Sequence, residues 1–181
     1  MKKLLLLFAL ISISCLANAQ STYKAFKVDL DLGYAIPSGT TGTGTKAGVT
    51  FTVEPHYRLS DDLAVGLRFE GAGLGYEDNS GTSNKVHISL LTSYCPTLEY
   101  YFSKGGFRPF AGAGLGIFSQ ESVATSNGSS TLVPGASSFG FFPRVGFEAG
   151  HFRMSGAYNV VGNNQSYVAF TIGAFFGGGK K

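Results

Sequence analysis

A histidine and a serine in the stretch His87-Ile88-Ser89 have the types and spacing of a nucleophile beside its general base. On a β-strand, residues two apart point to the same face, so the two side chains would lie together. An attacking serine needs its base within hydrogen-bond reach, and the base needs an orienting partner. Glu99 shares that face but lies about 33 Å further along such a strand, at about 3.3 Å per residue. No catalytic residue is therefore predicted.

The sequence GAGLG occurs twice, at residues 71–75 and 112–116. The dinucleotide-binding fingerprint places its third glycine three residues after the second and opens a helix. Here the glycines recur at every second residue, within segments of strand periodicity, so neither copy predicts a bound nucleotide.

The two copies differ in the face on which their glycines are expected. In the second copy the glycines fall on the polar face of a strand. In the first, the phase set by Leu67 and Phe69 points the glycines to the apolar face and Leu74 to the polar one. Either a bulge near Glu70 and Gly71 resets this phase, or the strand ends there.

The remaining reactive residue types show no cofactor pattern. His56 and His151 stand at no spacing that suggests a metal site. Cys95 is expected to be a small packed side chain, and it has no partner for an internal disulfide once residues 1–19 are removed. No basic run or zinc spacing indicates nucleic acid as a partner. Neither a metal nor a cofactor is predicted.

Residues 1–19 have the pattern of a cleavable signal peptide. Lys2 and Lys3 precede the apolar run 4–16, and Ala17-Asn18-Ala19 is a small-x-small cleavage site. Lipidation at Cys15 is disfavoured, because Ser12 stands where a lipobox has an aliphatic residue. Residues 20–181 are then one domain, with 12 of the 14 basic residues against 11 acidic ones, a net charge of +1.

This domain alternates apolar and polar residues with period two, which is typical of β-strands. Outside residues 1–19, no apolar run approaches the 18 or more residues that a membrane helix needs. Eight such segments are predicted: 26–34, 49–59, 63–69, 86–102, 107–117, 139–147, 152–160 and 168–176. Longer polar connections at 38–47, 75–85, 119–138 and 161–166 alternate with tight turns at 60–62, 103–106 and 150–151. This is the layout of an outer-membrane barrel, with its long loops outside the cell.

The charged residues within the strands all fall on one face. They are Lys27, Asp29, Asp31, Glu54, Arg58, Arg68, Glu70, Glu99, Arg108, Arg144, Glu148 and Arg153. Turning a charge to lipid costs about 2–4 kcal/mol at mid-membrane, so the apolar face would meet lipid and the charges would fill the lumen. A soluble lipocalin-like barrel, with its apolar face inward, is the structural alternative. The charged face also carries many glycines, and the apolar face is the bulkier, which suits a narrow lumen.

Aromatic residues gather near the turns, as in an interfacial girdle. The periplasmic girdle is predicted to contain Tyr57, Tyr100, Phe102, Phe107, Phe147, Phe152 and Phe176, and the outer one Tyr34, Tyr76, Phe139, Phe141 and Tyr158. Prolines stand inside strand segments at Pro55, Pro96, Pro109 and Pro143. Since proline cannot donate to a ladder, bulges or missing bonds are expected near the periplasmic rim.

The segments PTLEYYFSKGGFRPFAGAGLGIF at 96–118 and VAFTIGAFFGGGKK at 168–181, with the signal peptide, resemble the small outer-membrane β-barrel domain proteins of the OmpA/OmpX type. The resemblance implies an all-β fold, an eight-stranded antiparallel up-and-down transmembrane barrel. It also implies that the protein is exported through the inner membrane and lies in the outer membrane of a diderm bacterium. Its surroundings would be outer-membrane lipid and lipopolysaccharide, and the barrel-insertion machinery would be a partner. Such barrels commonly end in an aromatic residue, whereas here Phe176 precedes Gly-Gly-Gly-Lys-Lys.

The expected function is structural or adhesive and not enzymatic. The lumen would be plugged by the charged network, and loops 38–47, 75–85 and 119–138 could meet an extracellular ligand. Three alternatives stay open: a narrow transport barrel for small or apolar solutes, a lipid A hydrolase built on His87 and Ser89, and a soluble lipocalin-like carrier.

Overall fold

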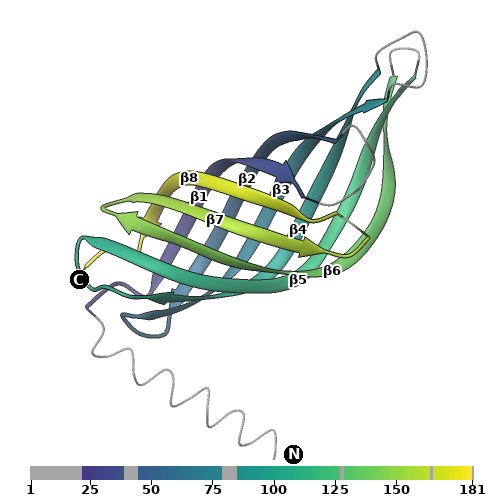
Figure 1. The fold of residues 1–181 in the computed structure, drawn as a ribbon. Helices are drawn as coiled ribbons and strands as arrows, with labels where there is room; N and C mark the ends of the chain where they lie inside the picture. Colours follow the sequence, from purple (N-terminus) through teal and green to yellow (C-terminus); the bar gives the residue numbers. More distant parts are fainter. Residues whose placement is uncertain (1–21, 39–44, 79–84, 127–128, 164, 181) are drawn as a thin grey trace, which may run out of the picture.

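The chain forms one closed sheet of eight antiparallel strands, in a computed structural model that describes residues 22–38, 45–78, 85–126, 129–163 and 165–180 (Figure 1). The strands are β1 (Phe26–Pro37), β2 (Thr45–Arg58), β3 (Leu63–Asp78), β4 (Lys85–Tyr101), β5 (Phe107–Ser126), β6 (Ser129–Ala149), β7 (Phe152–Val161) and β8 (Tyr167–Gly177). Each strand pairs with its neighbour in sequence, and β1 also pairs with β8. The predicted eight-stranded up-and-down barrel is confirmed.

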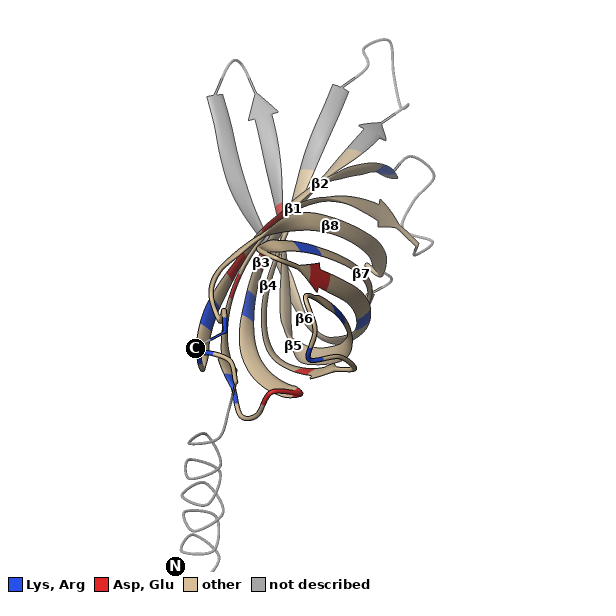
Figure 2. Ribbon diagram, turned by 90° about the vertical axis from the view of Figure 1, so that its left-hand side faces the viewer, with Lys and Arg blue, Asp and Glu red and all other residues tan. Residues whose placement is uncertain are grey.

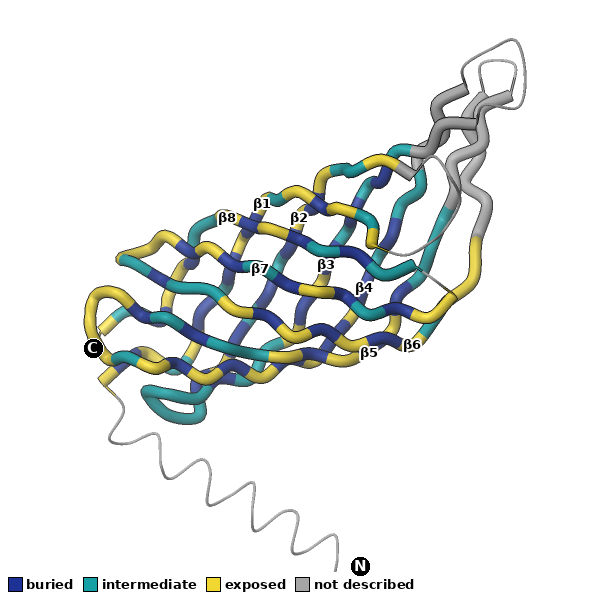
Figure 3. Tube along the Cα trace, viewed as in Figure 1, coloured by how far each residue is buried: buried dark blue, intermediate teal, exposed yellow. Residues whose placement is uncertain are grey.

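The apolar face of the sheet is the outer face. Buried and exposed residues alternate along the strands (Figure 3). The exposed ones include Leu32, Val49 and Phe139, each with more than 60% of its surface exposed. The twelve charged residues predicted for the polar face point inward instead. The lipocalin-like alternative is therefore wrong, because it needs the opposite arrangement. Among the described residues, no helix is long and apolar enough to cross a membrane.

Several strands continue into the segments predicted as long polar connections. β3 runs to Asp78 and β4 begins at Lys85, while β5 and β6 pair as far as Ser126 and Ser129. The prediction that 75–85 and 119–138 connect the strands was wrong for residues 75–78, 85, 119–126 and 129–138, which lie within strands. In these residues the backbone pairing of the barrel continues without a lipid-facing apolar row, so the sequence shows no period-two apolar pattern there.

The first GAGLG copy keeps its phase without interruption. β3 pairs with β4 in one register from Leu63 and Tyr100 to Asp78 and Lys85. Gly71 faces outward into open space, and Leu74 is buried in the lumen. Both expected explanations, a bulge near Gly71 or a strand end there, are wrong. The bulge lies in the partner strand β2 instead, between Lys46 and Val49.

The second GAGLG copy faces the lumen, as predicted, and its glycines make space for neighbouring chains. A Cβ atom on Gly114 would lie 2.5 Å from Cζ of Phe142, and one on Gly116 would lie 2.1 Å from the backbone oxygen of Tyr94. The same relation joins Gly146 to the Phe110 ring. Lumen glycines therefore leave room for the aromatic rings that fill a narrow barrel.

The strand prolines interrupt pairing without shifting the register. Pro55, Pro96 and Pro143 pair normally with the preceding strand. Pairing with the following strand skips each of them and the residue before it, then resumes in the same register. Missing bonds are thus confirmed and bulges are not, because losing one N–H group removes ladder bonds without adding a residue.

Candidate functional site in the barrel lumen

The twelve charged residues expected in the lumen are all buried inside the barrel, with at most 6% of each residue exposed. They come from every strand except β8, and Figure 2 marks the positions of the positive and negative residues along the ribbon. Six are positive and six are negative. We call the ten of these other than Arg68 and Glu70, together with His56 and Tyr101, the lumen network.

Two guanidinium groups lie at the centre of the network. Arg144 on β6 contacts Glu54 Oε1 at 2.6 Å and Glu99 Oε1 at 2.7 Å. Arg153 on β7 forms an ion pair with Glu99 and contacts Asp29 Oδ2 at 3.2 Å. Together these two residues join carboxylates from β1, β2 and β4, which are separated along the sequence but meet across the narrow lumen.

The periplasmic side of the network centres on Glu148. Its carboxylate pairs with Lys27 and accepts a hydrogen bond of 2.9 Å from Arg153 Nη1. Arg58 Nη2 lies 3.4 Å from its other oxygen. The Tyr101 hydroxyl lies 2.9 Å from Glu148 Oε1 and also 2.7 Å from a Glu99 oxygen. Sequence reasoning missed Tyr101, although alternation from Glu99 places it on the same face.

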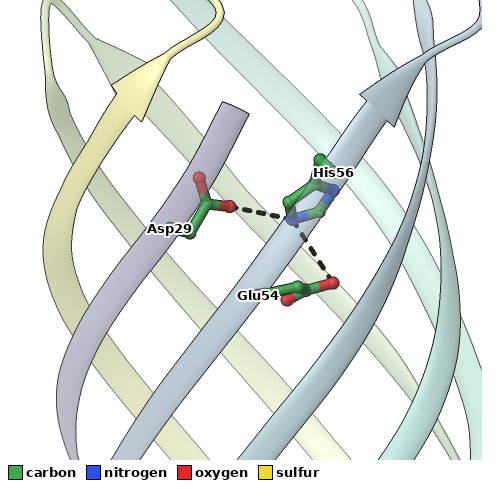
Figure 4. A group of neighbouring side chains, drawn as sticks. All are labelled: Asp29, Glu54 and His56. Atoms are coloured by element: carbon green, nitrogen blue, oxygen red, sulfur yellow. Dashed lines mark ion pairs between the residues drawn. The ribbon is translucent and has the colours of Figure 1, made fainter. Parts of the chain in front are cut away.

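His56 lies among three carboxylates, of which Figure 4 shows Asp29 and Glu54. Its Nε2 atom is 2.9 Å from Asp29 Oδ2 and 3.3 Å from Glu54 Oε1, and its Nδ1 atom is 3.7 Å from Glu99 Oε2. An imidazole with carboxylates beside both nitrogens suits the protonated ring, which donates from both. The sequence contains the Glu54-x-His56 spacing, but only the register between β1 and β2 adds Asp29.

Asp29, Glu54 and His56 are also the described group whose atoms lie close enough to hold a metal ion. Both carboxylates already have cationic partners, however. Asp29 lies 3.2 Å from both Lys27 Nζ and Arg153 Nε, and Glu54 pairs with Arg144. A divalent ion would have to compete with these fixed charges, so the geometry favours an ion-pair network over a metal centre.

A second, smaller group lies nearer the outer mouth. Arg68 stacks on the Phe142 ring, with Cζ 3.5 Å from the ring centroid, and donates to Asn159 Oδ1 at 2.8 Å. Glu70 lies 3.5 Å from Arg68 Nη1 and accepts a hydrogen bond from the Tyr167 hydroxyl. This pair therefore has its own partners and is distinct from the central network.

An apolar layer and a chain of amides follow toward the outside. The layer contains Ala35, Ala72, Leu74, Leu91, Phe118, Val161 and Ala169. Above it, the Gln120 side chain donates to Ser89 Oγ at 2.9 Å and accepts a hydrogen bond from Gln165 of the β7–β8 connection. These contacts reach across the outer mouth from β4 to the end of β7.

The periplasmic mouth is covered by residues 22–25 and 177–180, which we call the periplasmic cap. Tyr23 forms a bridge with Lys180, and the Lys24 N–H donates to Gly179 O at 2.8 Å. Arg58 Nη1 donates to Gly178 O at 2.7 Å, and its guanidinium lies 4.8 Å from the Tyr23 ring centroid. Residues 177–180 therefore fold back over the lumen.

The His-Ser-Glu constellation of the lipid A hydrolase alternative is not assembled among the described side chains. Ser89 accepts its hydrogen bond from Gln120 near the outer mouth. Glu99 lies toward the other end of β4, where Arg144 and Arg153 hold it. The side chain of His87 lies outside the described residues.

The seven residues of the expected periplasmic girdle point outward. Six are exposed, and Phe147 is half-buried between Phe107 and Phe152, at ring separations of 5.1 and 6.0 Å. Tyr100 and Phe102 form another ring pair at 5.3 Å. The expected outer girdle residues Tyr34, Phe139, Phe141 and Tyr158 are also exposed, whereas the side chain of Tyr76 lies outside the described residues.

A closed barrel with an apolar exterior and an interior of paired charges defines a class of membrane β-barrel proteins. The family profile described as outer membrane protein beta-barrel domain matches residues 4–179. The chain belongs to this family. No curated protein matches it.

Solved structures show the same fold at low sequence identity. Neisserial surface protein A is 18% identical, with a TM-score of 0.59, covering 86% of this chain and 98% of that one. OprG of Pseudomonas aeruginosa is 14% identical, with a TM-score of 0.53 and coverage of 87% and 99%. Ail of Yersinia pestis, in complex with a heparin analogue, is 14% identical, with a TM-score of 0.52 and coverage of 84% and 99%. The family match supports an outer-membrane location.

Proposed function

We propose that this protein is a non-conducting outer-membrane barrel that anchors a strand extension for contact with molecules outside the cell, without catalysis. The observation that carries the proposal is the filled lumen. From the periplasm outward, it holds the periplasmic cap, the lumen network, the Arg68 group, the apolar layer and the Gln120 amide chain.

Charges inside the lumen do not by themselves make an ion path. The network residues are at most 6% exposed and are paired with one another, so a permeating ion would have to break buried ion pairs. Removing one partner of such a pair costs about 3–5 kcal/mol. An eight-stranded barrel is also just wide enough for side chains to fill it. A plug is therefore the expected role of the lumen network.

The outer extension supports a surface role. β6 pairs with β7 only as far as Gly140 and Val161, whereas its pairing with β5 continues to Ser129 and Ser126. The hairpin thus rises beyond the ends of β7 and β8 (Figure 1). Its sequence is rich in serine and threonine and has few charges, which suits hydrogen bonding to a glycan or protein surface. Ail, one of the structural neighbours, is named as an attachment invasion locus protein.

Planar-bilayer recording tests the plug. We expect steady zero current from the refolded barrel, with a wide-lumen porin in the same membrane as the positive control. Reproducible unit currents would overturn the plug and favour the transport alternative.

Shortening the β5–β6 hairpin tests the surface role. Ser122 and Val133 are paired, so residues 123–132 can be replaced by Asn-Gly without changing the register. We expect cells producing the shortened barrel to adhere less to an immobilised extracellular-matrix preparation than cells producing the full chain at equal folded amounts. Equal adhesion would argue against the hairpin as the contact surface. Mass spectrometry of lipid A from the same cells, with His87→Ala as the comparison, tests the proposed lack of catalysis.

A further inference from the structure

The outer wall carries a groove of about 750 Å³ that crosses β6, β7, β8 and β1. Its floor is one row of paired residues, Gly146, Ser155, Thr171 and Gly33, whose side chains are small and face the lumen. The outer surface of a barrel wall is otherwise convex. A depression of this size therefore needs two rows of outward side chains that are separated by a row of small residues.

The two sides of the groove are the outward rows on either side of this floor. The periplasmic row runs from Phe147 on β6 to Leu32 on β1, and the outer row runs from Val145 to Tyr34. In the outer row β7 contributes Gly156, which has no side chain and so leaves the row open at its centre. No charged residue lines the groove.

The groove rises from the periplasmic edge of the wall toward its middle. Phe147 is two residues from the end of β6 at Ala149, and Leu32 is six residues from the start of β1 at Phe26. The apolar band of such barrels is about 25 Å tall, so the β6 end lies at its lower edge. The β1 end lies about 20 Å along its strand, at about 3.3 Å per residue.

We propose that this groove binds one acyl chain of a phospholipid from the periplasmic leaflet. The groove is continuous with the lipid-facing surface, where the available occupants are apolar. Its lower end opens beside the aromatic residues Phe107, Phe147 and Phe152. These residues mark the edge of the region where a lipid headgroup would lie. A chain entering there would point its methyl end toward Leu32 and Tyr34.

The test uses the refolded barrel in vesicles of phosphatidylethanolamine that carries a photoreactive diazirine on one acyl chain. With the diazirine near the carboxyl end, we expect crosslinks at Phe147 and Met154. With it at the methyl end, we expect them at Leu32 and Tyr34. The reverse order would assign the occupant to the outer leaflet and overturn the proposal, as would crosslinks spread evenly around the wall.

Gly156→Leu fills the groove. A Cβ atom there would meet only the Phe170 ring, at 3.4 and 3.5 Å, so the barrel can accept it. Gly71→Leu is the matched control, because Gly71 is an outward glycine on β3 with nothing within 4 Å of its Cβ position. Crosslinking at the groove should fall several-fold in Gly156→Leu and stay unchanged in Gly71→Leu. Val145→Phe narrows the same groove if Gly156→Leu does not fold, and undiminished crosslinking in a folded groove variant would overturn the proposal.

Discussion

Replacing Arg153 with methionine should be among the most destabilising single changes in the lumen network. Arg153 forms ion pairs with Glu99, Glu148 and Asp29, which come from three different strands. Its guanidinium also lies 4.1 Å from the Phe110 ring centroid. Methionine retains much of the side-chain volume but removes the charge, so the three carboxylates stay buried with one cation fewer.

The expected cost follows from what each carboxylate keeps. Glu99 retains Arg144, Glu148 retains Lys27, and Asp29 retains Lys27. Asp31, whose Oδ2 lies 3.9 Å from Arg153 Nε, loses the one ion pair described for it, so the loss should match the removal of one partner from a buried pair, about 3–5 kcal/mol. Arg108→Met is the comparison. Arg108 lies 3.8 Å from its nearest carboxylate and donates mainly to backbone oxygens, so about 1.5–3 kcal/mol is expected.

Urea titration of the folded band on unboiled gels measures both changes. The chain contains no tryptophan, so the usual fluorescence signal is absent and the gel shift replaces it. Adding Glu99→Gln to Arg153→Met should restore part of the loss, because it removes the excess of one buried negative charge that Arg153→Met creates. The reasoning is refuted if Arg153→Met unfolds at the wild-type urea concentration, or if Arg108→Met is the more destabilised variant.

Three further predictions concern space and access. Gly114→Leu should prevent formation of the folded gel band, because a Cβ atom there would lie 2.5 Å from the Phe142 ring. The control Gly73→Leu should fold, because its side chain would enter open space outside the wall. Equal folding of the two variants would contradict the packing described. Gly178→Val should release the periplasmic cap, because φ is +61° and its Cβ would lie 2.6 Å from Lys27 Cβ. Hydrogen exchange at 178–180 should then accelerate, with Gly179→Val as the control that leaves exchange unchanged. Cys95 is fully buried, so a water-soluble maleimide should label it only after unfolding, and rapid labelling of the folded barrel would mean that water reaches the lumen.

Strand periodicity was sufficient to predict the barrel, its strand number and the inward face of the twelve charged residues assigned to strands. These are local properties, because period two assigns every residue of a strand to one of two faces. Arg153 and Glu99 are a clear example. Their inward direction follows from their own neighbours in sequence, without knowledge of any other strand.

The ion-pair partners and the strand ends could not be predicted in this way. Whether Arg153 meets Asp29 or Glu70 depends on the stagger between strands around the closed barrel, which no single segment encodes. His56 was not singled out for the same reason, because Asp29 reaches it only through the β1–β2 register. The ends of β5 and β6 were missed because a hairpin in water carries no lipid-facing pattern.

The periplasmic cap implies an order of assembly. Tyr23 and Lys180 are 157 residues apart in sequence but form a bridge in the folded barrel. The contact between Arg58 and Gly178 depends on β8 lying beside β1. Contacts of such long sequence separation close the largest loop, so their entropic cost is the highest in the molecule. The cap can therefore form only once the sheet has closed. The cap would then be the last part of the barrel to form, and its contacts across β1, β2 and the end of β8 would oppose reopening of the sheet.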